Sequence, residues 1–254
     1  MITLKTRPEI ERMRAACRLV ADVLRFLETR IEPGVTTADL DRWAEAYIRR
    51  HAGAEPAFKG LYGFPATLCT SINDEVVHGI PSDERRLREG DIVSIDVGVK
   101  LDGYFGDGAR TFAVGGVDAE AQRLLATTRE ALERGVEAAQ PGNQIGDISA
   151  AIQETAEAAG YSIVHELVGH GIGTRPHEEP QVPNYGRRGQ GVRLRPGLVL
   201  AIEPMFNAGL GEIRTLDDHW TIVTADGRLS AHFEHTVAIT EGGPVVLTAQ
   251  DGEG

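Results

Sequence analysis

The 254-residue sequence predicts an α+β fold made of two related halves, in which helices pack against antiparallel strands. Three observations support this prediction. Segments with helical periodicity occur in two pairs, one before residue 53 and one between residues 119 and 159. A run of β-forming residues at 90–110 turns at Asp102-Gly103, a dipeptide typical of tight hairpins. The order helix, helix and hairpin then occurs a second time, which indicates an internal duplication.

The first helix begins with a capping box, in which Thr6 and Glu9 satisfy backbone N–H groups of the first turn. Pro8 fits there because its missing N–H would have no partner in that turn. An apolar stripe follows in steps of three and four residues, and Pro33-Gly34 ends the helix. The stripe consists of Ile10, Met13, Cys17, Val20, Leu24 and Leu27.

The next elements follow in the same order in each half. A second helix begins at Thr36-Thr37 and ends at Gly53. The segment 58–65 is too rich in glycine for a regular element, and a short strand is expected at 67–72. After the hairpin we expect helices at about 119–139 and 145–159.

The central hairpin brings two carboxylates together. With a two-residue turn, Asp107 lies opposite Gly98 and diagonal to Asp96. Residues that are directly opposed, or two apart on a strand, share one face of the sheet. Both carboxylates therefore project from the same face, and they repel each other unless a cation or a shared proton lies between them. On the evidence of the hairpin alone, two unrelated polar residues on a solvated face of the sheet are an equally good interpretation.

Matched motifs support the duplication. The segment that begins at residue 33 resembles the one that begins at residue 141, and His-Gly-Ile at 78–80 recurs at 170–172. Asp96 and Glu203 each stand six residues after a glycine, at the end of an apolar strand. A site at the junction of the halves would receive one carboxylate strand from each. Chance similarity of two αβ units is the alternative, and the matched acidic positions argue against it.

The second half contributes further candidate ligands. His170 lies in a glycine-rich segment that we expect to be a flexible loop. A hairpin is expected to join 220–224 and 230–240 through a turn at Asp226-Gly227. On the second of these strands, alternation sets Glu234 on the opposite face from its two neighbours.

The candidate ligands form one chemical set of four carboxylates and an imidazole. Four negative charges match two divalent cations, and oxygen-rich coordination with one imidazole suits Mn, Fe, Co or Zn. Two such ions bind a bridging water as nucleophile in aminopeptidases and phosphatases. A structural zinc site would be rich in thiolates, and the sequence has no G-x-S-x-G motif. The set consists of Asp96, Asp107, His170, Glu203 and Glu234.

Composition excludes several classes of protein. The net charge of −12 argues against a nucleic-acid surface, so DNA is not an expected partner. Cys17 and Cys69 are the only cysteines and make no disulfide framework. The sequence shows neither a signal-peptide pattern nor an apolar run long enough for a membrane span. We therefore expect a cytoplasmic protein without a membrane partner.

From the N-terminal helix to about residue 248, the motifs as a set resemble type I methionine aminopeptidases. The resemblance implies the pita-bread fold, in which two αβ halves with antiparallel sheet and outer helices are related by a pseudo-twofold axis. It implies one catalytic domain at 1–250, with halves at about 1–115 and 116–250, and a flexible tail at 251–254. The motifs are HGIP at 78–81, Asp96, Asp107, GHGIG at 169–173, HEEP at 177–180, IEPM at 202–205 and FEHT at 233–236.

The same resemblance implies the roles of the site residues. Two divalent ions (Co, Mn, Fe or Zn) would share a hydroxide that attacks the substrate carbonyl, and Glu203 would accept a proton. His177 would stabilise the developing oxyanion, and His78 would bond the scissile amide region. One ion would be held by Asp96, Asp107 and Glu234, and the other by Asp107, His170, Glu203 and Glu234. The identity of the metal stays open, because the ligands accommodate several.

The resemblance also implies a pocket for the methionine side chain, and there the sequence departs from the family. Cys69 and Trp220 match the family pattern, whereas other positions lose hydroxyl groups and Gly98 stands where a hydroxyl residue is common. An apolar pocket still suits an unbranched thioether, but the strictness of methionine selection stays open. The pocket positions are Phe58, Leu61, Phe64, Cys69, Pro176 and Trp220.

The implied function is removal of the initiator methionine from nascent proteins whose second residue is small. Its partners would be N-terminal peptides, the enzyme would be a monomer, and association with the ribosome stays open. An Xaa-Pro aminopeptidase is the alternative enzyme, but such enzymes carry a further N-terminal domain, and this sequence begins with the capped helix. A non-catalytic binding protein of the same fold would have lost ligands that are all present here.

Overall fold

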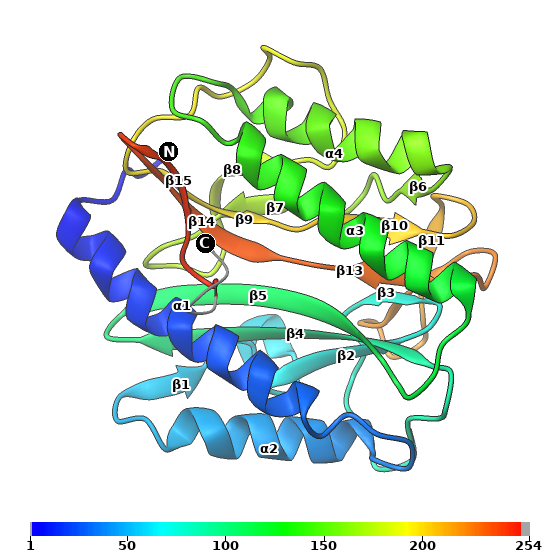
Figure 1. Cartoon of the computed structure of the whole chain (residues 1–254). Coiled ribbons are helices and arrows are strands. Elements are labelled where there is room, and N and C mark those ends of the chain that lie inside the picture. Colours follow the sequence, from blue (N-terminus) through cyan, green and yellow to red (C-terminus); the bar gives the residue numbers. More distant parts are fainter. Residues whose placement is uncertain (1, 250–254) are drawn as a thin grey trace.

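The two longest strands form the hairpin that the sequence predicts. In the computed structural model, which describes residues 2–249, they are β4 (Ile92–Leu101) and β5 (Tyr104–Ala113) (Figure 1). Gly98 pairs with Asp107, as the two-residue turn requires. Asp102 and Gly103 in the turn have φ values of 49° and 81°, the left-handed conformation that this tight turn demands. The expected tail at 251–254 lies outside the described residues.

The first half packs two helices against the sheet of this hairpin. Helices α1 (Arg7–Glu28) and α2 (Thr37–Arg49) cover a sheet in which β4 pairs with β5, β1 (Ala54–Pro56) and β2 (Leu68–Ile72). The apolar stripe of α1 is buried throughout, as predicted. The sequence predicts that Pro33 and Gly53 end the two helices. Each helix ends at least four residues earlier, because a short turn precedes Pro33 and another precedes Gly53. The side chains at 93, 95, 97 and 99 enter this core, which leaves Asp96 on the other face.

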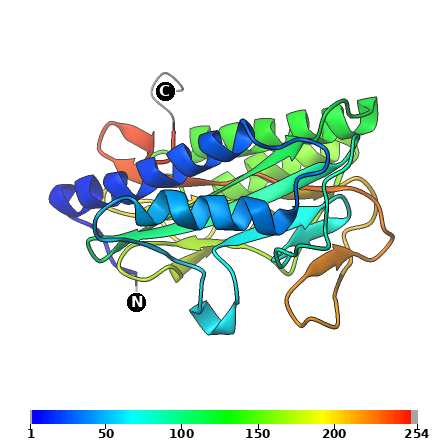
Figure 2. The same ribbon diagram turned by 90° about the horizontal axis from the view of Figure 1, so that it is seen from below.

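The second half repeats the arrangement. Helices α3 (Ala119–Ala138) and α4 (Ile145–Ala159) pack over a sheet with the order β15 (Gly243–Val246), β14 (His235–Thr240), β9 (Val199–Ile202), β7 (Gly169–Gly171) and β8 (Glu178–Val182). In Figure 2 the four helices lie toward one side of the strands. The loop with the 3-10 turn Leu61–Gly63 and the loop around β11 project from the opposite side.

Two predictions for the second half are wrong. Strand β12 (Ile222–Thr224) does not form a hairpin with 230–240. It pairs instead with β11 (Ile213–Thr215) and with β3 (Glu75–Val77) of the first half. His170 lies in strand β7 and not in a flexible loop, because its backbone pairs with both β8 and β9.

The segment 230–240 is broken at the point where it meets the first half. Strand β13 (Ser230–His232) pairs with β10 (Met205–Asn207), which also pairs with β6 (Ser162–Ile163). Between β13 and β14, the Glu234 N–H donates to the carbonyl oxygen of Ala109 in β5, at 2.8 Å. Glu234 therefore leaves its own sheet and projects its side chain between the two halves.

Two threonine hydroxyls join the halves on either side of this point. The Thr236 hydroxyl donates to the Asp107 carbonyl oxygen at 2.7 Å and accepts from the Asp107 N–H at 3.1 Å. The Thr111 hydroxyl makes the equivalent pair of bonds with the His232 backbone, at 2.8 and 2.9 Å. These bonds hold β5 beside β13 and β14.

Among the described residues, no helix is long and apolar enough to cross a membrane.

Candidate metal and substrate site

A cavity of about 300 Å³ lies at the junction of the two halves. One part of its wall is formed by carboxylates and imidazoles, and the other by aromatic and aliphatic side chains. All five predicted ligands line it, together with His78, His177 and every predicted pocket residue except Pro176. Its lining residues are Phe58, Leu61, Tyr62, Phe64, Cys69, Val77, His78, Asp96, Asp107, Leu167, Val168, His170, His177, Glu203, Met205, Trp220, His232 and Glu234.

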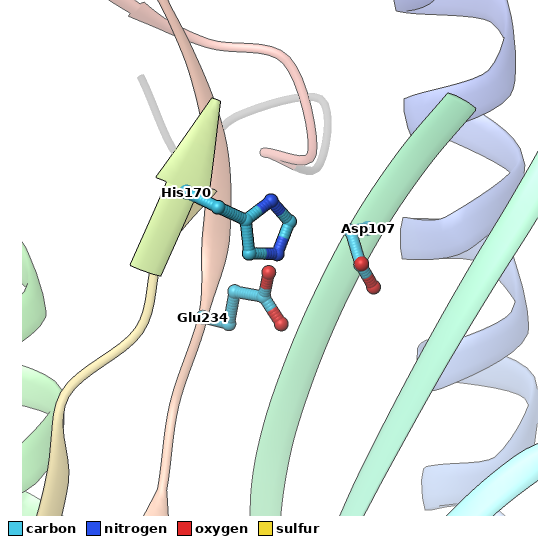
Figure 3. Close-up of side chains that lie close together, drawn as sticks. All are labelled: Asp107, His170 and Glu234. Carbon is cyan, nitrogen blue, oxygen red and sulfur yellow. The ribbon is translucent and has the colours of Figure 1, made fainter. Parts of the chain in front are cut away.

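Three of the predicted ligands meet at one point. In Figure 3, Asp107 from β5, His170 from β7 and Glu234 from the segment after β13 point toward one another. One ligand atom of each lies within 4.8 Å of those of the other two, which is close enough for all three to bind a common ion. Asp96 projects from the same face of the hairpin as Asp107, because its partner across β5 is Ala109 and Asp107 is two residues away.

Glu203 follows β9 and reaches the cavity between two histidines. Its Oε1 lies 3.5 Å from His170 Nε2, and its Oε2 lies 3.8 Å from His232 Nε2. The other nitrogen of His170, Nδ1, lies 2.9 Å from the Gly171 carbonyl oxygen, to which it donates. This bond sets the tautomer, so that Nε2 presents a lone pair to the cavity.

The electrostatics of the cluster fit bound cations. Burial raises the pKa of Asp96 to about 7. Burial, followed by the charges of neighbouring carboxylates, raises the pKa values of Asp107, Glu203 and Glu234 well above their usual range. Buried Asp96 Oδ1 and Glu234 Oε1 have no hydrogen-bond partner within 2–249. Divalent ions would satisfy these oxygens and allow the carboxylates to ionise together.

His177 lies at the mouth of the cavity, where its ring is exposed. It stacks on Tyr62 with ring centroids 5.8 Å apart and an angle of 13° between the planes. The Tyr62 hydroxyl lies 3.4 Å from His177 Nδ1, and when it donates to Nδ1 the proton of the neutral ring is on Nε2. Burial lowers the pKa of His177, and so the neutral imidazole is the form that faces the site.

His78 lies on the other side of the cavity, in a backbone conformation with φ of 60°. Its ring meets Trp220 edge to face, with centroids 6.4 Å apart. Burial, and then the charge of His177, lowers its pKa. The next residue, Gly79, packs directly on the backbone, since a Cβ there would lie 2.1 Å from the Thr70 carbonyl oxygen.

Aromatic residues close the apolar part of the cavity. Phe64 meets Trp220 edge to face, with centroids 5.1 Å apart, and Phe58 and Cys69 complete the buried cluster. The ring of Phe58 fills the space beside Gly98, where a Cβ would lie 2.6 Å from Phe58 Cε1. Phe58 and Gly98 are therefore complementary in size, and a side chain at position 98 would have no room here.

Several lining residues were not predicted from the sequence. His232 could have been found, because the sequence predicts one strand at 230–240, on which His232 and Glu234, two residues apart, would share a face. Its buried Nε2 atom has no hydrogen-bond partner among the described residues. Tyr62 and Leu167 carried no comparable signal, since single apolar or aromatic residues are usual in any core or loop. Met205 belongs to the IEPM motif at 202–205, but an apolar residue in a motif does not by itself indicate a cavity wall.

A second hollow lies on the outer surface between α3 and α4 and measures about 510 Å³. Its lining contains no histidine, and its charged side chains pair with one another, as in Arg134–Glu130 and Arg188–Glu154. It therefore lacks the combination of ligands and apolar wall that distinguishes the cavity between the halves.

Comparisons with known proteins agree with this geometry. A family model described as metallopeptidase family M24 matches residues 11–241. The chain is 53% identical to a methionine aminopeptidase of Clostridium perfringens, over 98% of this chain and 99% of that protein. The crystal structure of methionine aminopeptidase from Thermotoga maritima matches with a TM-score of 0.96 and 45% identity, over 98% and 100% of the two chains. A prolidase from Pyrococcus furiosus matches less well, with a TM-score of 0.77 and 28% identity, over 97% of this chain and 65% of that one.

Proposed function

The chain belongs to metallopeptidase family M24, and from this premise we propose that it is a methionine aminopeptidase. It removes the initiator methionine from proteins whose second residue is small. Its fold is the pita-bread fold that the sequence resemblance implied. The similarity to methionine aminopeptidases favours this activity over Xaa-Pro cleavage, because both the identity and the TM-score are higher than for the prolidase.

One observation carries the proposal: the ligand cluster and a closed apolar pocket belong to the same cavity. A terminal amine beside the carboxylates would place the first side chain among Phe64, Cys69 and Trp220. An unbranched thioether is apolar and flexible enough for such a pocket, and sulfur makes favourable contacts with aromatic rings. The cavity therefore supports recognition of a free N-terminal methionine.

We propose that the buried donors hold two divalent ions, of Co, Mn, Fe or Zn. When bound, such ions activate a water molecule as the nucleophile by lowering its pKa, and they neutralise the carboxylates. Asp107 and Glu234 would help to hold both ions, and their ligand atoms lie within 4.8 Å of that of His170. Asp96 would complete the ligands of one ion, and His170 and Glu203 would complete those of the other.

The chain's own groups handle the proton and the developing charge. Glu203 accepts the proton of the attacking water and passes it to the departing amine. His177 donates from Nε2 to the carbonyl oxygen as negative charge develops there, a form of stabilisation that depends on donors placed in advance. His78, across the cavity, bonds the scissile amide region. Each assignment rests on the position of the side chain at the cavity wall.

We further propose that the substrates are N-terminal segments of nascent proteins in the cytoplasm, cleaved by one catalytic domain that spans 1–250. An assay on three peptides tests the function. Met-Ala-Ser should be cleaved after methionine much faster than Ala-Pro-Ser by the purified protein with one metal at fixed pH. Faster release of alanine from Ala-Pro-Ser would favour the Xaa-Pro activity. If none of Met-Ala-Ser, Met-Gly-Ser and Ala-Pro-Ser is cleaved with any of the four metals, both the methionine aminopeptidase and the Xaa-Pro activity are overturned.

A further inference from the structure

A buried ion pair outside the cavity joins the start of the chain to the loop that carries His177. Lys5 Nζ lies 2.6 Å from Glu178 Oε2, and the two residues are 173 positions apart in the sequence. The exposed fractions of the two side chains are 3% and 4%. Neither residue lines the cavity. A fully enclosed pair of charges is expensive to bury, and so its location beside a proposed catalytic residue calls for a physical explanation.

Glu178 organises the loop between β7 and β8. Its Oε1 accepts hydrogen bonds from the backbone N–H groups of Thr174 and Arg175, at 3.0 and 3.2 Å. Burial raises the pKa of Glu178, but the hydrogen bond and charge of Lys5 and the two N–H groups more than offset this, and the pKa lies below its usual value. The loop is thus wrapped around an ionised carboxylate, one residue after His177.

Lys5 is itself firmly placed. Its backbone N–H donates to the Gly197 carbonyl oxygen at 2.6 Å, and its ammonium also donates to the Thr3 carbonyl oxygen at 3.2 Å. Its side chain passes over Gly173, where a Cβ would lie 2.3 Å from Lys5 Cε. The lysine therefore fills the inside of the loop and fixes the distance between Gly173 and Glu178.

His177 depends on this loop for its position, because Tyr62, the partner of its ring and of its Nδ1, is itself exposed. The ring is exposed, stacks on the exposed Tyr62 and meets His170 edge to face. We infer that Lys5 is a positioning residue for His177, acting through Glu178 and the backbone of the 173–178 loop. This inference rests on the proposed function, in which His177 stabilises the oxyanion.

Removing the ammonium should release the loop. Without Lys5, the Glu178 carboxylate would remain enclosed without a counter-charge and would move toward water. The Thr174 and Arg175 N–H groups would lose their acceptor, and His177 would sample positions away from the substrate carbonyl. Because an oxyanion donor acts mainly in the transition state, the loss should fall on kcat and not on KM.

The central experiment combines Lys5→Met with His177→Ala in a cycle of four proteins assayed on Met-Ala-Ser. Lys5→Met alone should lower kcat about 10–100-fold, the range for partners that orient a site from outside it, with KM nearly unchanged. In the His177→Ala background, Lys5→Met should change kcat by less than about twofold, because its target is already absent. Equal losses in both backgrounds, or no loss in either, would overturn the inference.

Further variants separate positioning from general stability. Lys5→Met/Glu178→Gln should recover most of the lost kcat, because a neutral amide oxygen can still accept from Thr174 and Arg175. Lys100→Met removes a half-exposed lysine paired with Glu55 at 3.6 Å, and it should leave kcat unchanged. Metal content and thermal midpoint are measured for every variant, and a kcat loss in Lys5→Met that follows metal content would overturn the inference.

The inference and the proposed function fail in different ways. If the unaltered protein does not cleave Met-Ala-Ser, the function is wrong. If it does so and Lys5→Met is fully active, only the inference is wrong. Should Lys5→Met alone not fold, Glu178→Gln takes its place in the cycle with His177→Ala, because it leaves the Lys5 ammonium without its counter-charge. It should lower kcat in the unaltered background and change it by less than about twofold in the His177→Ala background, and equal losses in both would overturn the inference.

Discussion

The rings of His170 and His177 lie 4.5 Å apart between centroids and meet edge to face at 81°. The first belongs to β7 and turns Nε2 toward Glu203, whereas the second precedes β8 at the mouth of the cavity. One short antiparallel pair therefore supplies both a candidate ligand and a candidate donor. The loop between them ends at Glu178, one residue after His177, and the ion pair with Lys5 is made there.

Activity should depend on divalent metal. Exhaustive chelation is expected to abolish cleavage of Met-Ala-Ser and to lower the thermal midpoint, because the buried carboxylates would lose their counter-charges. Adding back Mn, Fe, Co or Zn should restore both. The measurements are peptide release, metal content and a thermal unfolding curve. Full activity in protein verified to be free of metal would contradict the assignment of the cluster.

Asp107→Ala and His177→Ala should behave differently. Asp107 lies at the centre of the cluster, so its loss is expected to empty the site of metal. His177→Ala should keep the metal and lower kcat by about 10²–10³, as for loss of one oxyanion donor. Metal analysis and steady-state kinetics on the same preparations check this. If His177→Ala loses metal and recovers full turnover when metal is added, the two roles are wrong.

Peptide selection should follow the shape and charge of the cavity. A free amine is required beside the carboxylates, so N-acetylated Met-Ala-Ser should be refused. Met-Ala-Ser should be cleaved far faster than Met-Lys-Ser, because the second side chain would lie near His78, where we expect crowding. Lys-Ala-Ser should hardly react, since its charge would be desolvated in the apolar pocket. Comparable kcat/KM for Met-Ala-Ser and Met-Lys-Ser would remove the steric argument.

Gly98→Ala should disturb the methionine pocket. The added Cβ would lie 2.6 Å from Phe58 Cε1 and 2.9 Å from Ala57 Cβ, so the ring must move. Overpacking of this kind costs about 1–3 kcal/mol in the free energy of unfolding, and we also expect a higher KM for Met-Ala-Ser. Gly242→Ala is the matched control, because its nearest neighbour would be 3.8 Å away. Equal stability and KM in both variants would refute the proposed fit of Phe58 over Gly98.

Asp39→Asn should destabilise the protein in a pH-dependent way. The Thr36 hydroxyl, followed by Arg42 and the Thr36 N–H, lowers the pKa of Asp39 from 3.8 to about 2. A carboxylate whose pKa is depressed on folding stabilises the protein above its unfolded pKa, and this contribution is lost as the pH falls through the folded pKa. The difference in unfolding free energy from the unaltered protein should therefore be constant near neutral pH and shrink between pH 3.8 and about 2. Urea titrations across this range measure it, and a pH-independent difference would show that the charge of Asp39 is unimportant.

Local chemistry explains which parts of the fold could be predicted. The capping residues Thr6 and Thr36 mark the starts of α1 and α2 correctly, because a cap satisfies N–H groups within its own turn. The Asp102-Gly103 turn sets the register of β4 and β5, since a two-residue hairpin loop allows one pairing only. That register placed Asp96 and Asp107 on one face before any three-dimensional information.

Matched motifs explain which parts of the candidate site could be predicted. The five candidate ligands were recognised from two carboxylate strands at equivalent positions in the halves and from the family resemblance, and all five line one cavity. Tyr62 was missed, because it belongs to no motif or periodic pattern, and Met205 was missed although it ends the IEPM motif at 202–205. Pro176 was expected in the pocket, yet its partly exposed position on the loop before His177 keeps it out of the lining.

By itself, the sequence determined the helices, the central hairpin and the set of candidate ligands, all of which depend on residues close together or on repeated motifs. Only the tertiary structure decided how the halves join. The three-residue strand β12 pairs with β3 across the molecule, Thr236 bonds the backbone of Asp107, and Lys5 reaches Glu178. Each of these contacts joins residues more than a hundred positions apart, where no local pattern selects the partner. Packing of the whole chain brings such groups together. Burial then requires each hydrogen-bond donor and each charge to have a partner among the groups around it.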